Sequence, residues 1–229
     1  MSAPQLPGRY AGWSSLRDLL DRRVESVLVP EMTVLDVGAG RRPTILPEER
    51  PSATAYVGLD VELAELTGAD PGSYDEAHAG SVVTWVPAFE SRFDLVVSCY
   101  AFEHVKPMPE ALENIRRYLR PGGMLIALFS GSFSAHAVAN RVLPEAVAAR
   151  LIGREPETKF RAHYDRCWYG ALERDLASWS AARISPLYLG APYFAFSPAL
   201  RRAYVAYENV AARQPHRNLA SHYLLEATR

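Results

Sequence analysis

Residues 34–40 read Val34-Leu35-Asp36-Val37-Gly38-Ala39-Gly40, an apolar run that ends in a carboxylate and two closely spaced glycines. An apolar run that breaks at glycine is typical of a buried parallel strand that meets a tight turn. Glycine is needed at such a turn because a Cβ would hold the backbone away from a ligand, and because the turn often requires a positive φ. Ligands of open α/β sheets bind at this carboxyl edge of the strands. The stretch therefore predicts the first strand of a ligand-binding α/β fold.

Strand-like and helix-like patterns alternate along the rest of the chain. Apolar positions at helical spacing predict helices over 16–28, 109–119 and 137–152, and apolar runs predict strands over 55–59, 93–98 and 124–129. This alternation implies a parallel sheet covered on both faces. The tail differs, because it predicts a strand over 183–189, a helix from 198 to about 213 and a last strand over 221–227.

A second acidic residue, Asp60, closes the strand-like run Tyr56-Val57-Gly58-Leu59-Asp60. A carboxylate at this place can accept hydrogen bonds from both hydroxyls of a ribose. Each feature alone has an ordinary explanation, since Asp-x-Gly after a strand is commonly just a turn and an acid after a strand is commonly a helix cap. Together, in this order and spacing, they favour a bound nucleoside.

The composition narrows the class of protein. The chain has 229 residues, which fits one α/β domain, and a formal net charge of -1 with scattered Lys and Arg, which disfavours a nucleic-acid partner. The stretch Met1–Tyr10 lacks the apolar core of a secretory signal, and no apolar run is long enough to span a bilayer. We expect a cytoplasmic protein with no membrane partner, in which Cys99 and Cys167 are free thiols. The oligomeric state stays open, with a homodimer as one option.

In these residues the sequence resembles the class I, Rossmann-like S-adenosylmethionine-dependent methyltransferases, specifically their bacterial small-molecule group, which share a run like 35–40. Colinear matches follow at 93–98, 102–105 and 119–125. The resemblance implies an α/β fold, with a doubly wound, seven-stranded, mostly parallel sheet, a C-terminal reversed β-hairpin and helices on both faces. It also implies a single domain over 1–229, with an N-terminal helical segment at 1–30 and a helical lid or acceptor insert at 130–180.

The resemblance further implies which residues bind S-adenosylmethionine and its product S-adenosylhomocysteine. The glycine turn passes under the methionine part, Asp60 holds the ribose, adenine lies near Ser81, and Ser98 begins the floor beside the sulfonium. Asp36 orients the turn or reaches the ammonium group, and Arg41 is a candidate for the carboxylate, although a solvated turn residue is an equal alternative. The expected cofactor-binding residues are Asp36, Gly38, Ala39, Gly40, Arg41, Asp60, Val61, Ser81, Val82, Ser98, Cys99 and Tyr100.

Two other nucleotide sites fit less well. Arg42 stands where the commonest glycine-rich turn has a third glycine, and a dinucleotide fingerprint needs that glycine to open its helix. A P-loop is excluded because no glycine-rich stretch ends in Gly-Lys-Ser or Gly-Lys-Thr.

The expected chemistry is methyl transfer to a small molecule. Transfer from a sulfonium is an in-line displacement in which positioning supplies most of the catalysis, but a hydroxyl acceptor must also lose its proton to a nearby base. The catalytic candidates are His104 and His163. Other residues expected near the site are Glu103, His136 and the segment 159–169. We interpret this segment as part of a lid, with a polar loop as the alternative. An Asn-Pro-Pro-Tyr type of motif and a metal-ligand cluster are absent from the sequence, so we expect a metal-independent transfer to a hydroxyl oxygen of a metabolite or natural product. The alternative is an S-adenosylmethionine-binding protein without methyl transfer.

Overall fold

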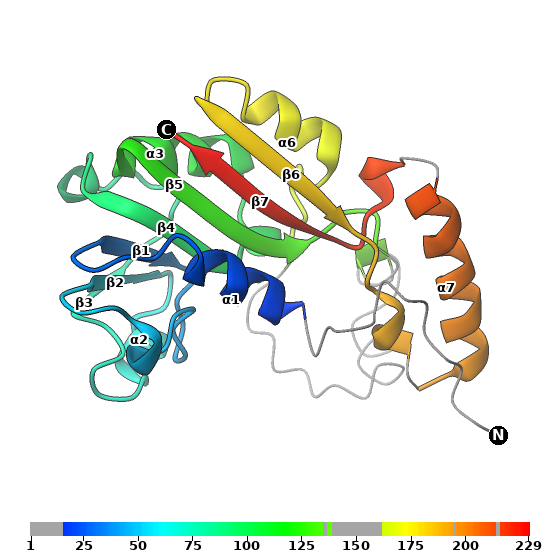
Figure 1. Ribbon diagram of the computed structural model, residues 1–229, viewed down its shortest axis with the longest axis horizontal. Coiled ribbons are helices and arrows are strands. Elements are labelled where there is room, and N and C mark those ends of the chain that lie inside the picture. The colour runs from blue at the N-terminus through cyan, green and yellow to red at the C-terminus, as the bar shows by residue number, and fades with distance from the viewer. Residues whose placement is uncertain (1–15, 135–136, 139–161, 195, 214–215) are drawn as a thin grey trace.

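The computed structural model describes residues 16–134, 137–138, 162–194, 196–213 and 216–229. One sheet of seven strands, flanked by helices, organises these residues (Figure 1). The strands are β1 (Thr33–Val37), β2 (Ala55–Asp60), β3 (Glu76–Ala79), β4 (Phe93–Cys99), β5 (Leu119–Ser130), β6 (Ala181–Leu187) and β7 (His222–Thr228). The helices are α1 (Arg17–Glu25), α2 (Leu63–Thr67), α3 (Met108–Tyr118), α6 (Tyr169–Asp175) and α7 (Pro198–Arg213), with short 3₁₀ turns that include Phe102–His104.

The strand order places the first strand at the centre of the parallel part. The order is β3-β2-β1-β4-β5-β7-β6, and β1 pairs in parallel with β2 on one side and β4 on the other. β7 runs antiparallel to both β5 and β6 and so forms the reversed C-terminal hairpin. Both the doubly wound, mostly parallel sheet and the reversed hairpin predicted from the sequence are confirmed.

Alternating side chains of the strands build two cores, one on each face of the sheet. On one face, Leu20 and Val24 of α1 pack with strand residues that include Val34. On the other face, α3 and α6 pack with strand residues that include Leu35 and Val37. Figure 1 shows α1 in front of the sheet and α3 and α6 behind it. Burial on both faces explains why these strands are nearly continuous apolar runs rather than alternating ones.

Several elements differ from the sequence expectation, among them β5, β3 and α6, and α2 was not predicted either. β5 starts at Leu119, before the apolar run 124–129, because Leu119 already pairs with Phe93 before the register shifts and Met124 pairs with Leu95. β3 was not expected because an edge strand bonded only to β2 has no buried apolar run. α6 was not expected either, and its buried Leu172 belongs to the core, so this end of the expected insert 130–180 is part of the packed domain.

Some expected elements lie outside the described residues. This holds for nearly all of the helix expected over 137–152, for the beginning of the segment 159–169, for His136, and for residues 1–15 of the N-terminal segment. No helix in the described ranges is both long and apolar enough to cross a membrane.

Candidate active site

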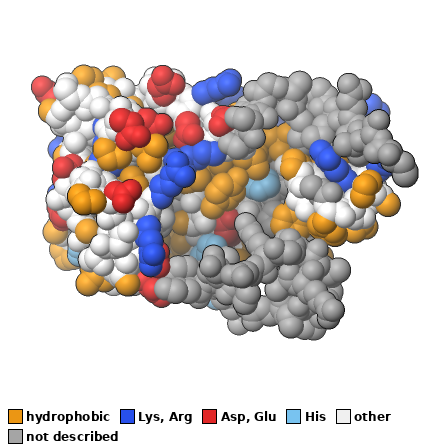
Figure 2. Space-filling model, turned by 90° about the horizontal axis from the view of Figure 1, so that it is seen from below, with side chains coloured by type: hydrophobic (Ala, Val, Ile, Leu, Met, Phe, Trp, Pro, Cys, Tyr) orange, Lys and Arg blue, Asp and Glu red, His pale blue; other side chains and the backbone are white. Residues whose placement is uncertain are grey.

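A cavity of about 450 Å³ opens at the carboxyl ends of the parallel strands. Its wall is formed by the turn after β1, the end of β2, the segment 80–83 that follows β3, the residues after β4, and His163. Figure 2 looks onto a hollow on this side of the molecule, with histidine side chains inside it and Lys and Arg side chains along its margin. The volume falls within the range of about 300–1,000 Å³ that is usual for small-molecule sites.

The glycine turn has the geometry that the sequence predicts. Gly38 has a φ of +73°, and a Cβ at this position would lie 2.2 Å from the Cβ of Ala101, so no other residue fits without a shift of the chain. Gly40 has a φ of +59°, and its missing Cβ would meet nothing within 4 Å. The backbone N–H of Gly38 donates to the carbonyl of Leu59 over 2.9 Å, which fixes the turn on the end of β2. The turn therefore forms a rigid surface over which a ligand can lie closely.

The side chain of Tyr74, which was not predicted to belong to the site, fixes this turn through hydrogen bonds to its backbone. Its hydroxyl lies 2.9 Å from the carbonyl oxygen of Ala39 and 3.0 Å from that of Gly40. Gly58 makes room for the ring, because a Cβ there would lie 2.7 Å from it. A glycine inside a buried strand signals such a close approach, and this was the available hint in the sequence.

Asp60 stands beside the turn with its carboxylate fixed in place. Its Oδ2 accepts from the backbone N–H of Gly40 and its Oδ1 from that of Glu62, each over 3.0 Å. A carboxylate has about four lone-pair sites. Each oxygen of Asp60 thus keeps acceptor capacity toward the cavity, as a ribose diol would require.

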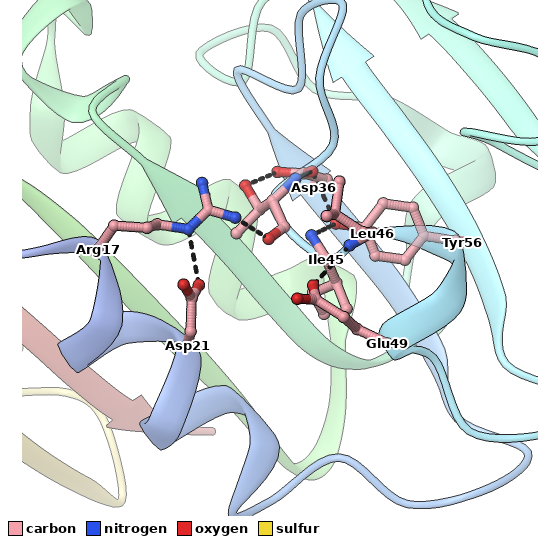
Figure 3. A network of polar contacts seen from close by, with 8 residues as sticks. Arg17, Asp21, Asp36, Ile45, Leu46, Glu49 and Tyr56 are labelled. Atoms are coloured by element: carbon pink, nitrogen blue, oxygen red, sulfur yellow. Dashed lines mark hydrogen bonds and ion pairs between the residues drawn. The ribbon is translucent and has the colours of Figure 1, made fainter. Parts of the chain in front are cut away.

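Asp36 does not reach the cavity. Its carboxylate is fully buried and accepts from the backbone N–H of Thr44 over 2.6 Å, from the Thr44 hydroxyl over 2.8 Å and from the Tyr56 hydroxyl over 2.7 Å. Figure 3 shows this network, in which Arg17 of α1 donates to the carbonyl of Thr44. Burial raises the pKa of the Asp36 carboxyl above its usual range. Of the two roles expected for Asp36, the structure shows the one of orienting the turn.

The segment 81–83 forms the far wall and is held by α3. Asn114 donates through Nδ2 to the carbonyl oxygens of Val82, over 3.0 Å, and Val83, over 2.8 Å. Ser81 uses its hydroxyl oxygen to accept from the backbone N–H of Val83 over 3.3 Å. Asn114 gave no signal in the sequence, since a polar residue on a helix is ordinary.

The residues that end β4 divide between the two faces of the sheet. Ser98 is buried and donates to the carbonyl of Val37 over 2.9 Å. Cys99 packs against the core under α1, where burial raises the pKa of its thiol to about 11. Tyr100 alone of the three lines the cavity, in a left-handed conformation with φ +56° and with its ring edge-on to His222. A left-handed conformation is uncommon for a residue with a bulky side chain, and such residues cluster at functional sites.

The 3₁₀ turn after β4 brings the two predicted catalytic histidines together at the cavity. His104 lines the cavity, and its Nδ1 is buried without a hydrogen-bond partner among the described residues. The carbonyl of Glu103 accepts from the backbone N–H groups of His163 and Tyr164, each over 2.8 Å. The Glu103 side chain is buried behind the wall, where Oε1 accepts from Ser130 over 3.4 Å and burial raises the pKa of the carboxyl. Glu103 therefore joins the two segments that carry the histidines.

The structure brings most of the predicted site residues together. Those that line the cavity are Gly38, Gly40, Asp60, Val61, Ser81, Val82, Tyr100, His104 and His163. Those outside its wall are Asp36, Ala39, Arg41, Ser98 and Cys99. Arg41 forms an ion pair with Glu65 over 3.1 Å, its side chain is 62% exposed, and it does not line the cavity.

Comparison with known proteins places this geometry in a family. A family model described as a methyltransferase domain matches residues 9–179. The chain belongs to this methyltransferase family. The Rossmann-like class I methyltransferase predicted from the sequence is thus confirmed in family and fold.

A curated relative supports the same family. The chain is 30% identical over 117 residues to malonyl-[acyl-carrier protein] O-methyltransferase 1 of Coxiella burnetii, an alignment that covers 49% of this chain and 38% of that protein. The match thus spans less than half the length of the relative.

Solved structures of two methyltransferases and a cyclase share the fold at low sequence identity. Phosphoethanolamine N-methyltransferase 2 of Haemonchus contortus, solved with S-adenosylhomocysteine, superposes with a TM-score of 0.60 at 14% identity over 100% of this chain and 54% of that chain. Geranyl diphosphate C-methyltransferase of Streptomyces coelicolor was also solved with S-adenosylhomocysteine. It superposes with a TM-score of 0.57 at 13% identity, over 93% of this chain and 74% of that chain. The [4+2]-cyclase SpnF superposes with a TM-score of 0.57 at 18% identity, over 93% of this chain and 80% of that chain.

The described ranges of the chain contain no group of three or more His, Cys, Asp or Glu side chains that could hold a metal ion.

Proposed function

We propose that the cavity binds S-adenosylmethionine and that the protein transfers its methyl group to a hydroxyl oxygen of a small metabolite or natural product. The observation that carries the proposal is the pairing of the glycine turn with Asp60, which present an open backbone surface and a fixed carboxylate side by side. The methionine part of the cofactor would lie over Gly38 and Gly40, the ribose on Asp60 beside Val61, and the adenine near Ser81 and Val82.

The fit rests on the chain's own groups. Gly40 leaves the space that a Cβ would fill, and the oxygens of Asp60 retain acceptor capacity. Bound S-adenosylmethionine supplies an activated methyl group, so the protein's task is to orient the acceptor and to exclude water. In this proposal His104, beside the end of β4, takes the proton of the hydroxyl, and His163 lines the same cavity.

Oxygen is the proposed acceptor atom on two grounds. The sequence lacks an Asn-Pro-Pro-Tyr type of motif, and the curated relative is named an O-methyltransferase. A metal-independent reaction is part of the same proposal, as is a single domain over 1–229 in which part of the segment 130–180 borders the acceptor.

The first experiment is calorimetric titration with S-adenosylmethionine, S-adenosylhomocysteine and, as a control, a reduced nicotinamide dinucleotide. We expect binding of the two sulfur nucleosides alone. Asp60→Asn should raise the dissociation constant of S-adenosylhomocysteine about tenfold or more, because hydrogen bonds to a charged group are worth about 1.5–3 kcal/mol. Asp70→Asn, which changes an exposed acid that does not line the cavity, is the matched control and should leave this dissociation constant unchanged.

Binding alone does not establish transfer. Wild-type protein and His104→Gln should then be compared for methyl transfer from labelled cofactor to a panel of hydroxylated metabolites. Turnover by the wild type and its loss in the variant would support the proposal. Cofactor binding with no transfer to any hydroxyl would instead favour the alternative of a binding protein or non-methylating catalyst, a role on this fold for which the neighbouring cyclase gives a precedent.

A further inference from the structure

Three residues with nitrogen-bearing side chains, His104, Lys106 and His163, line the cavity. His104 and Lys106 belong to the segment between β4 and α3, and the backbone of His163 is bonded to Glu103 of that segment. We call these three side chains the basic wall. It lies on the β4 side of the cavity, whereas Asp60 and Glu65 lie on the β2 side.

The nitrogens of the basic wall are not used by the protein itself. Within the described part of the chain, the side chains of Lys106 and His163 make no hydrogen bond or ion pair, and the Nδ1 of His104 is buried without a partner. Lys106 and His163 are both exposed, and together with His104 they place three nitrogen-bearing side chains along one cavity. A buried nitrogen without a partner, here Nδ1 of His104, together with cationic or protonatable side chains along a cavity, points to a group that arrives with the ligand.

The acidic groups near the basic wall do not line the cavity. Asp165 accepts from the backbone N–H of Met108 over 2.9 Å, at the start of α3. Glu103 is buried behind the wall and does not line the cavity. On the opposite side, Glu65 is paired with Arg41. Among the described residues, no carboxylate on the β4 side lines the cavity, and Glu103 interacts with His104 from behind the wall.

The order of the strands assigns this side to the acceptor. Asp60 on β2 marks the ribose, the glycine turn on β1 marks the methionine part, and β4 is the next strand beyond β1. A molecule that extends across β2 and β1 leaves the β4 side for the second substrate. Resting on the proposed function, we propose that the methyl acceptor carries an anionic oxyacid group, a carboxylate or a phosphate monoester, that is bound by Lys106 and His163.

The chemistry of the two side chains suits such a group. Lysine offers three donors around a compact charge, and its hydrogen bonds to an oxyanion are about twice as strong as neutral ones. A histidine adds a donor with direction. The pair would fix one end of the acceptor while its hydroxyl approaches His104.

The test uses anions as probes on the cofactor-loaded protein. Inorganic phosphate and acetate, the simplest members of the two classes, are titrated separately by calorimetry into the wild type saturated with S-adenosylhomocysteine at low ionic strength. Lys106→Met and His163→Asn should each weaken anion binding about tenfold, and Lys106→Arg should restore most of it. Arg22→Met, which removes one exposed positive charge from α1, is the control and should have no effect. The stronger binder of the two probes identifies the class of oxyacid.

The outcomes separate this inference from the proposed function. No binding of S-adenosylhomocysteine to the wild type would contradict the proposed function. Normal cofactor binding with no anion binding, or anion binding equal in wild type and both wall variants, would overturn only the inference. A large loss of S-adenosylhomocysteine affinity in Lys106→Met would overturn it as well, because Lys106 would then bind the carboxylate of the cofactor.

Discussion

Asp36 and Asp60 are both carboxylates at or near the ends of neighbouring strands, yet their surroundings differ in kind. Asp36 is fully buried and surrounded by three donors from Thr44 and Tyr56. Asp60 is partly exposed, accepts from two backbone N–H groups and lines the cavity. At the scale of single residues, one carboxylate therefore holds the local chain together and the other is presented to a ligand.

The buried charge of Asp36 predicts a pH dependence of stability. Because burial raises the pKa of this carboxyl, the folded state binds the proton more tightly than the unfolded state does. The free energy of unfolding should then fall as pH rises from about 4, the usual Asp value, through the raised pKa. Asp36→Asn keeps a carbonyl oxygen for two of the donors but carries no charge. The free energy of unfolding of this variant, relative to that of the wild type, should therefore increase as pH rises from about 4 through the raised pKa.

Urea unfolding of both proteins at several pH values between 4 and 8 measures this difference. The contribution of Glu103, whose pKa is also raised by burial, is present in both proteins and cancels. A difference in unfolding free energy that stays constant with pH would show that Asp36 keeps its ordinary pKa.

At the scale of elements, helix α3 holds the wall segment by side chains that reach across to its backbone. Asn114 bonds the carbonyls of Val82 and Val83, and the Tyr118 hydroxyl donates to the carbonyl of Thr84 over 3.1 Å and accepts from the backbone N–H of Val86 over 3.0 Å. Both side chains lie on α3, which packs its apolar side under the sheet. A helix in the core thus sets the position of a segment that has no regular structure of its own.

Asn114→Asp should disturb this wall without changing the shape of the residue. The new oxygen would face two carbonyl oxygens in place of a donor, so we expect a loss of about 1–3 kcal/mol in unfolding free energy and weaker S-adenosylhomocysteine binding. The same change at Asn218, whose Oδ1 only accepts from Gly170, should stay within about 0.5 kcal/mol. Equal effects at the two positions would show that Asn114 does not hold the wall.

At the scale of the whole molecule, β7 joins the parallel part of the sheet to β6. Leu225 of β7 pairs with Ala127 of β5 and Ile184 of β6, and its side chain is fully buried in the core that also contains residues of α3 and α6. In Figure 1, β7 runs from one end of the sheet to the other between these neighbours. The last strand of the sequence is thus built into the same core as the strands around the cavity.

Leu225→Ala should therefore destabilise the molecule as one unit. We expect a loss of about 2–5 kcal/mol from the cavity left in the core. Leu200→Ala, at a residue of α7 that is 50% exposed, should change stability by less than about 0.5 kcal/mol. Urea unfolding followed by circular dichroism and by tryptophan fluorescence should give one coincident transition, and two separate transitions would contradict a single cooperative unit.

The sequence by itself determined the features that depend on neighbouring residues. The apolar runs of β1, β2 and β4, the positive φ at Gly38 and Gly40, and the place of Asp60 at the end of β2 follow from local patterns. They are readable because burial on both faces of a sheet and a tight turn each demand particular residue types within a few positions.

Only the tertiary structure decided which side chains face the cavity. Successive side chains of a strand point to opposite faces, so Ser98 and Cys99 could not both accompany Tyr100 into the site. Tyr74 and Asn114 reach the site from segments far along the chain, and Arg41 is paired with Glu65. These partners are chosen by packing between distant parts of the chain, whereas sequence patterns record only what each segment needs locally.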